Sequence, residues 1–302
     1  MRTAYLRIAL ANIAVLVSGV LGLAHAGTSE VITIKPYGQD DQRYRYAQIL
    51  LEMSLEKAGQ TARVRQMDTE LSRDRLLPEL IDGEIIHVVA EAPKPGWEEN
   101  LLTIRIPIRK GIQGHRLFLI NKQDQPAISQ VETLEDLRAF PTGSGTQWST
   151  RRVMEDAGFQ VVTAPEYKTL FDMLKLQRFT TFGRGLNEIF QEQQVFSKTN
   201  PNLVIEETLC LFIPLPTYFF VSPKHPELAQ QIEAGLRQMI SDGSFDKHFL
   251  DFHGNDIALA KLESRKIFSI ANPNLSPLTP LDDKSLWLDP RNLSGKGSDS
   301  DS

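Results

Sequence analysis

Strands and helices alternate along the first part of the chain, and this alternation limits the folds that the sequence can adopt. Strands are expected at Val31–Ile34, Val64–Met67 and Ile85–Val89, with helix-period stretches at Tyr46–Lys57 and Leu76–Ile81 between them. The last of these strands is apolar almost throughout, as strands covered on both faces are. The pattern predicts a parallel sheet with helices on both faces, and therefore an α/β fold.

A second α/β unit follows the first. The strand Arg116–Asn121 ends in the polar stretch Lys122–Pro126, which we interpret as the first crossing between two lobes. Strands and helices then alternate up to Ile213, with one strand expected at Phe179–Phe182, and the strand Tyr218–Val221 returns the chain to the first lobe. Helices are expected to follow at Pro226–Ser241 and Ser244–Phe252. Each lobe is expected to hold a mixed or mostly parallel sheet. The expected boundaries are 27–123 with 214–256 for lobe 1, 124–213 for lobe 2, 257–294 for an extended C-terminal segment docked on a lobe, and 295–302 for a disordered tail. The extended segment is expected to dock through Leu275, Leu278, Leu281 and Trp287.

The N-terminus has the features of a secretory signal peptide. Arg2 and Arg7 precede an apolar run from Ile8 to Leu23, which ends in the small-residue site Ala24–Ala26. A transmembrane anchor is the alternative, but the run is shorter than the roughly 20 residues that span a bilayer. We expect cleavage after Ala26 and a soluble, periplasmic chain, whose formal charge changes from −5 to −7 when the two arginines are removed.

The composition argues against several functions. The net charge is −5, whereas nucleic-acid-binding proteins carry a basic face. The lone cysteine, Cys210, lies in an apolar run and is interpreted as a buried structural thiol. His248 and His253 are five residues apart and do not share a helix face, and no nucleophile motif has a partner base. We expect no nucleic-acid partner, no metal, no cofactor and no enzyme activity.

The segment Pro141–Thr150, PTGSGTQWST, combines two glycines with hydroxyl residues ahead of a predicted helix. A dinucleotide fingerprint needs a third glycine at Trp148, and a P-loop needs a lysine that is missing, so nucleotide binding is disfavoured. Two interpretations remain open. The free N–H groups of a helix start could bind a small anion such as a carboxylate. Alternatively, Ser149 or Thr150 caps the helix while the glycines form a turn.

Five stretches of the chain resemble a known family in their order. They are LLPELIDGEIIHVVAEA (76–92), RIPIRKGIQGHRLFLINK (105–122), VETLEDLRAFPTGSGTQWSTRRVMEDAGFQVV (131–162), FGRGLNEIF (182–190) and FFVSPKHPELAQQIEAGLRQMISDGSFDKHF (219–249). Their order resembles the extracytoplasmic solute-binding proteins of family 3, which have the type II periplasmic binding fold. The resemblance implies a cleft between two lobes, in which the loop Gly143–Ser149 offers hydroxyls and N–H groups to a ligand's carboxylate.

Two positions depart from the family's pattern. Amino-acid binders of this family usually carry an arginine in a T-x-x-R-type motif after the strand that matches Ile85–Val89, and this chain has Ala92–Trp97 there instead. They also usually offer an acidic residue to the ligand's ammonium where this chain has Arg184. A guanidinium repels an ammonium, so Arg184 favours an anionic ligand if it faces the cleft. The alternative is that Arg184 is a solvated or lobe-stabilising residue.

Further candidates follow the strands of lobe 1. Glu91 and Trp97 come after the third strand, and Trp97 could either stack on a ligand or cover the edge of the core. Arg109 and Lys110 lie near the crossing and are interpreted mainly as surface charges. The expected ligand-binding residues are Tyr37, Glu91, Trp97, Ser144, Gly145, Thr146, Trp148, Ser149 and Arg184.

These expectations describe a monomeric binding protein that closes on a small anionic or amino-acid-like solute by hinge motion. The resemblance implies an ABC-type permease as the membrane partner. A sensing subunit for a membrane receptor, and an exported lyase or dehydratase on the same fold, remain alternatives.

Overall fold

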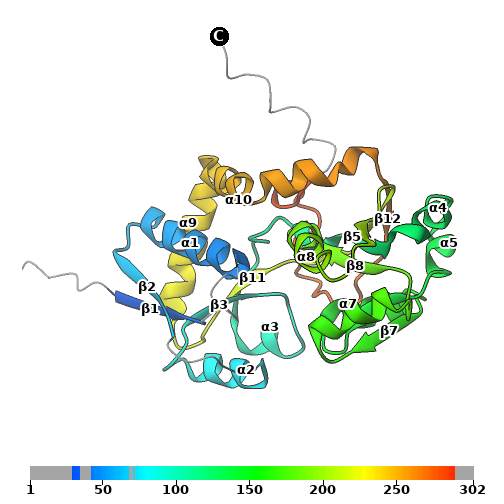
Figure 1. Cartoon of the computed structure of the whole chain (residues 1–302). Coiled ribbons are helices and arrows are strands. Elements are labelled where there is room, and N and C mark those ends of the chain that lie inside the picture. Colours follow the sequence, from blue (N-terminus) through cyan, green and yellow to red (C-terminus); the bar gives the residue numbers. More distant parts are fainter. Residues whose placement is uncertain (1–28, 35–41, 68–70, 72, 290–302) are drawn as a thin grey trace, which may run out of the picture.

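The computed structural model describes residues 29–34, 42–67, 71 and 73–289. The predicted signal peptide, Tyr37 and the predicted tail lie outside these residues. Two α/β lobes lie side by side, and each contains both parallel and antiparallel strand pairs (Figure 1). The predicted α/β class with mixed sheets is therefore confirmed.

Lobe 1 holds a two-stranded and a three-stranded sheet that lie side by side and are flanked by helices. Its strands, in spatial order, are β2 (Ala62–Gln66), β1 (Ser29–Thr33), β3 (Val88–Glu91), β11 (Tyr218–Val221) and β4 (Leu102–Ile104). β1 and β2 are parallel, whereas β11 is antiparallel to both β3 and β4. The N–H of His87 donates to the carbonyl of Ile32 at 2.9 Å and joins the two groups of strands. The helices of this lobe are α1 (Gln42–Lys57), α2 (Arg73–Asp82), α3 (Trp97–Asn100) and α9 (Pro226–Ser241).

Helices α1 and α9 approach each other closely because α9 carries a glycine at the contact. A Cβ atom on Gly235 would lie 1.8 Å from the backbone oxygen of Ser54. Ser54 is itself fully buried, and its hydroxyl donates to the carbonyl of Leu51 at 2.8 Å. The backbones of the two helices can meet in this way only where a side chain is absent.

Lobe 2 is organised around β5 (His115–Asn121), which is buried at all of its positions. β5 is antiparallel to β8 (Phe182–Gly185), β9 (Leu203–Ile205) and β10 (Leu209–Phe212). A parallel pair, β6 (Thr142–Gly145) and β7 (Val161–Ala164), joins this sheet through a bridge between Thr142 and Thr181. The helices of this lobe are α4 (Gln125–Ile128), α5 (Leu134–Arg138), α6 (Ser149–Asp156), α7 (Tyr167–Lys175) and α8 (Ile189–Phe196).

The chain crosses between the lobes earlier than the sequence suggested. Because β5 pairs only with strands of lobe 2 among the described residues, the outgoing crossing is the segment 105–114 and not the predicted Lys122–Pro126. The polar stretch after β5 instead forms a short 3-10 turn, Lys122–Asp124, that leads into α4. The chain returns to lobe 1 through residues 213–217, between β10 and β11.

Residues beyond the return crossing connect the lobes again. Helix α10 (Ser244–Ala260) continues well past its predicted end at Phe252, and it runs from beside α9 toward lobe 2 (Figure 1). β12 (Lys266–Ser269) then pairs in parallel with β10. We call residues 265–288 the strap. It begins in the sheet of lobe 2 and returns to the outgoing crossing, where the N–H of Leu288 donates to the carbonyl of Lys110 at 2.8 Å.

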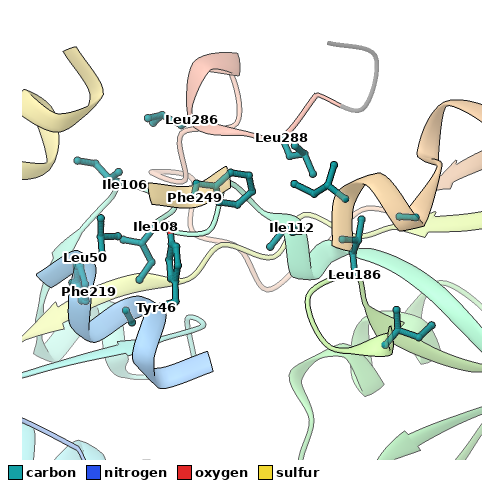
Figure 2. Close-up of a cluster of buried hydrophobic side chains, with 14 of the residues drawn as sticks. Tyr46, Leu50, Ile106, Ile108, Ile112, Leu186, Phe219, Phe249, Leu286 and Leu288 are labelled. Atoms are coloured by element: carbon teal, nitrogen blue, oxygen red, sulfur yellow. The ribbon is translucent and has the colours of Figure 1, made fainter. Parts of the chain in front are cut away.

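The end of the strap is part of the hydrophobic core. Leu286 and Leu288 belong to the same buried cluster as Ile108 of the outgoing crossing and Phe249 of α10 (Figure 2). The ring of Trp287 covers Gly111, where a Cβ atom would come within 2.5 Å of it. The predicted docking of Leu278 and Leu281 is not seen, since their exposed fractions are 66% and 41%.

In the part of the chain that the structure describes, the helices are too short or too polar to cross a membrane.

Two buried histidines near the crossings make stability depend on pH. Burial lowers the pKa of His115 to about 4 and that of His253 to about 3, from an ordinary value of 6.5. Just below pH 6.5 the folded chain keeps both rings neutral, whereas the unfolded chain protonates them. The stabilisation is therefore complete above pH 6.5 and is lost as the pH falls, by about 1.4 kcal/mol per pH unit for each ring.

We expect the melting temperature to fall steadily between pH 6.5 and 5.5, and a His253→Leu variant to lose part of this dependence, because burial also lowers the pKa values of His87 and His248. Thermal denaturation followed by circular dichroism at several pH values measures both effects. A melting temperature that stays constant over this interval would contradict the assignment.

Candidate functional site

A small cavity lies where both lobes, the return crossing and the strap meet. Its volume is about 20 Å³. The lining residues are Ala92 and Pro93 after β3, Ser149 at the first position of α6, Leu215 and Pro216 in the return crossing, and Asn272, Asn274 and Leu275 in the strap. A wider hollow of about 240 Å³ beside β4 and α9 is lined by lobe 1 alone. Because ligand sites prefer the interfaces between domains, the cavity shared by the two lobes is the better candidate.

The segment PTGSGTQWST contains a short strand where its glycines suggested an open loop. Residues 142–145 form β6, and α6 begins at Ser149. Both glycines are required by aromatic neighbours: a Cβ on Gly143 would lie 2.3 Å from the ring of Phe179, and one on Gly145 would lie 2.5 Å from the ring of Trp148. The glycines therefore serve packing within lobe 2.

The first turn of α6 keeps the property on which the anion interpretation rests. Trp148 precedes the helix with extended backbone and gives it no side-chain cap. The first turn reads Ser-Thr-Arg-Arg and contains no acidic residue. The side chain of Ser149 is exposed and lines the cavity, so this helix start is directed at the candidate site.

Trp148 packs over a buried arginine and is not among the residues that line the cavity. Its ring is nearly parallel to that of Phe182, with centroids 6.0 Å apart. The guanidinium of Arg184 lies 4.4 Å from the centroid of the Trp148 ring, within cation–π range. Trp148 and Arg184 are therefore brought together inside lobe 2.

Arg184 is surrounded by carboxylates. Its Nε and one of its terminal nitrogens donate to the two carboxylate oxygens of Glu192 at 2.6 and 2.7 Å, and Glu188 lies 3.0 Å away. The hydroxyl of Tyr167 also donates to Glu192, at 2.8 Å. Burial lowers the pKa of Arg184, but the two carboxylates outweigh this effect and hold the pKa above its ordinary value. Its charge is thus neutralised within lobe 2.

A second arginine completes this cluster. Arg116 donates to the carbonyls of Gly183 at 2.5 Å and Gln113 at 3.2 Å, and one of its nitrogens lies 3.6 Å from Glu188. Burial lowers the pKa of Arg116 to about 10, only partly offset by Glu188. Two guanidinium groups and two carboxylates have no net formal charge, so the cluster gives no positive field to the cleft.

The other predicted site residues are dispersed. Trp97 is a core residue with 3% of its surface exposed, and its ring meets that of Phe220 edge to face at 5.1 Å. Glu91 is paired with Lys94 at 3.1 Å. Ser144 is fully buried, and its hydroxyl has no hydrogen-bond partner among the described residues. Thr146 is half-buried beside β6. Of the predicted residues that are described, Ser149 is the one that lines the cavity.

Two cationic side chains near the outgoing crossing contact neighbouring parts of the fold. Arg109 is buried, and its guanidinium lies 4.8 Å from the centroid of the Tyr46 ring. Lys110 donates to Asp246 at 2.8 Å and to the carbonyl of Ser285 at 2.7 Å, which ties the crossing to α10 and to the strap. Within the described ranges, no three His, Cys, Asp or Glu side chains gather in a way that could hold a metal ion.

Comparison with known proteins identifies the fold of the chain. No family model matches the sequence, and no curated protein does. Among solved structures, a histidine kinase sensor domain with similarity to periplasmic binding proteins is 15% identical. The match covers 76% of this chain and 96% of that one, with a TM-score of 0.50. The chain has the type II periplasmic-binding-protein fold.

Other structures with related folds give lower scores. An ancestral arginine-binding protein bound to arginine is 21% identical over 75% of this chain and 98% of its own, with a TM-score of 0.49. A periplasmic His/Glu/Gln/Arg/opine family-binding protein from Silicibacter pomeroyi, in complex with lysine, is 11% identical over 70% and 87%, also with a TM-score of 0.49.

The cavity residues that sequence reasoning missed lie outside regular elements of this periplasmic-binding-protein fold. Leu215 and Pro216 belong to the Pro-Leu-Pro of the return crossing, and Asn272, Asn274 and Leu275 to the Asn-Pro-Asn-Leu turn of the strap. The proline and asparagine pattern indicates a turn at each place. Nothing in the pattern indicates that the two turns meet.

Proposed function

We propose that the chain binds a small solute in the cleft between its two lobes. The observation that carries this proposal is the cavity at the start of α6, to which both lobes and the return crossing contribute. The periplasmic-binding-protein fold supports it, since two lobes joined by crossing segments can close around a guest by hinge motion.

The chemistry of the lining favours a small anion over a zwitterionic amino acid. The eight described residues that line the cavity carry neither an acidic nor a basic side chain. An ammonium group would find no carboxylate there, which makes its burial costly. The start of α6 offers backbone N–H groups and the positive end of the helix dipole to an anion, and Ser149 adds a hydroxyl. Arg184 no longer supports this specificity, because Glu188 and Glu192 neutralise it.

The proposed role is capture of the solute for an ABC-type importer, with the closed form presented to a membrane permease. A sensing role is the second candidate, because the same fold occurs in a histidine kinase sensor domain. Reconstitution separates the two. Solute-dependent stimulation of a permease in proteoliposomes supports import, whereas solute-dependent autophosphorylation of a receptor kinase supports sensing.

A thermal-shift screen of the purified chain tests the binding proposal. The compounds are amino acids, dicarboxylates and short monocarboxylates, and a compound that binds the folded state raises the melting temperature by mass action. We expect carboxylates to do so. If only cationic compounds raised it, the anion proposal would be wrong.

The variant Ser149→Asp gives opposite effects on stability and on binding. A carboxylate in the first turn of α6 favours the helix by about 0.5 kcal/mol. The same charge repels an anion at the cavity, so the affinity for any carboxylate that binds the parent chain should fall at least tenfold. Calorimetric titration and thermal denaturation measure the two effects. Ser149→Asn is the control, because it adds similar bulk without charge, and equal affinities for the two variants would contradict an anion at this position.

A further inference from the structure

Three of the eight residues that line the cavity belong to neither lobe's α/β core but to the strap: Asn272, Asn274 and Leu275. We propose that the strap is a third wall of the solute site and that Leu275 limits the size of the solute. This inference rests on the proposed binding function and adds to it the element that sets specificity. The wall must be held in place to act in this way, and the contacts of the strap meet that condition.

The turn that carries the wall is itself ordered by hydrogen bonds. The side-chain amide of Asn272 donates to the carbonyl of Pro214 at 3.0 Å, which ties the strap to the return crossing. The side-chain oxygen of Asn272 accepts from the N–H of Asn274 at 3.1 Å, and its backbone carbonyl accepts from the N–H of Leu275 at 3.3 Å. Asn274 and Leu275 are therefore presented to the cavity by a turn whose first residue is fixed to the crossing.

The strap is also anchored before the wall, in lobe 2. β12 continues the sheet beside β10, and the N–H of Ile270 donates to the carbonyl of Phe212 at 3.0 Å. Arg265 donates to the carbonyls of Glu206 and Leu209 at 2.6 and 3.1 Å. This end of the strap has to move with lobe 2.

The other anchor lies at the outgoing crossing. The N–H of Leu288 donates to Lys110, and the ring of Trp287 covers Gly111, which has a φ of +66°. The indole N–H of Trp287 donates to the carbonyl of Pro280 at 2.8 Å, which folds the strap back on itself. With both ends and the turn attached, the wall cannot swing away from the cavity without breaking these contacts.

The size of the cavity makes the wall selective. A volume of about 20 Å³ is close to what a single water molecule needs, so a carboxylate enters only as the two lobes open by the proposed hinge motion while the wall stays in place. The half-buried side chain of Leu275 takes up space that a longer solute would need. Sites of this kind discriminate between homologues that differ by one methylene by roughly tenfold or more. Shortening Leu275 should therefore admit longer solutes.

The experiment compares Leu275→Ala with Leu278→Ala. Both leucines lie on the strap, but Leu278 is 66% exposed and does not line the cavity. The probes are the sodium salts of formate, acetate, propionate and butyrate, with formamide to butyramide as an uncharged series of the same lengths, and calorimetric titration gives each affinity. We expect the ratio of butyrate to acetate affinity to rise at least tenfold in Leu275→Ala. The ratio should stay at the parent value in Leu278→Ala and in the size-conserving Leu275→Met.

If the parent, Leu275→Ala and Leu278→Ala all preferred solutes of the same length, the proposal of a third wall would be wrong. The proposal of solute binding would still stand. Amides that bind and show the length shift, together with carboxylates that do not bind, would uphold the wall and refute the anion proposal. If no member of either series bound any of the proteins, the binding of small carboxylates and the wall that selects them would both be refuted.

Discussion

Replacing Glu192 by glutamine is expected to destabilise the protein by about 3 kcal/mol. Glu192 accepts two hydrogen bonds from Arg184 and one from Tyr167, and it is 8% exposed. Glutamine has nearly the same shape but no charge, and its amide nitrogen cannot accept a hydrogen bond. The buried Arg184 would keep only Glu188 as a counter-charge, at 3.0 Å. A buried cation that loses one of its partners is costly because water cannot replace the lost interaction.

Glu155→Gln is the matched control for this variant. Glu155 pairs with Arg151 across one helical turn at 3.2 Å, but its side chain is 39% exposed. Exposed pairs of this kind contribute about 0.5 kcal/mol or less. Urea denaturation of both variants gives the two free energies of unfolding. Equal values would mean that the Arg184 cluster is hydrated and flexible in solution.

Replacing Gly235 by alanine is expected to cost about 3 kcal/mol, although alanine is the better helix former. The added Cβ would lie 1.8 Å from the backbone oxygen of Ser54, so α9 would have to move away from α1. The neighbouring atom belongs to a helix backbone and cannot rotate aside. The shift would open the contact between the two helices over buried residues such as Leu51 and Leu236.

Gly254→Ala makes the same chemical change as Gly235→Ala but is expected to have the opposite effect on stability. Gly254 lies within α10, and a Cβ atom added there would have no heavy atom of the described residues within 4 Å, apart from its own chain neighbours and helix backbone. Alanine there should stabilise the protein by about 0.5 to 1 kcal/mol through helix propensity alone. Thermal or chemical denaturation of the two variants measures the difference. A neutral Gly235→Ala would show that α1 and α9 are further apart than described.

The regular elements of the fold could be predicted where local pattern decides them. The strand Tyr218–Val221 and the helix Pro226–Ser241 have the predicted bounds. Each has a strong local signal: an unbroken β-favouring apolar run for the strand, and a proline at the first turn with apolar helix periodicity for the helix.

The predicted bounds were wrong for elements whose extent depends on contacts with distant parts of the chain. The strand expected at Phe179–Phe182 is β8, Phe182–Gly185, because its pairing with β5 extends through two glycines that look like a turn in the sequence. The polar residues after β5 looked like a crossing but form the turn before α4. In both places a partner distant in the sequence outweighs the local preference.

The candidate site was predicted least well, for a physical reason. Glu188 and Glu192 follow Arg184 within eight residues, and two acidic residues so close to one arginine were a usable sign of an ion-pair cluster within lobe 2. The third wall had no such sign. Its position depends on a contact between Asn272 and Pro214, which are far apart in the sequence, and single-sequence patterns carry no information about such a meeting.

The late position of β12 in the chain has a consequence for biosynthesis. A ribosome delivers residues 266–269 only after both crossings and all other described strands have emerged. Until then β10, with the buried Leu209, Cys210 and Leu211, has one unpaired edge that can associate with strands of other nascent chains. The last of the described strands to be translated is thus the one that removes this aggregation risk, and ribosomal stalling shortly before it would be more harmful than stalling just after it.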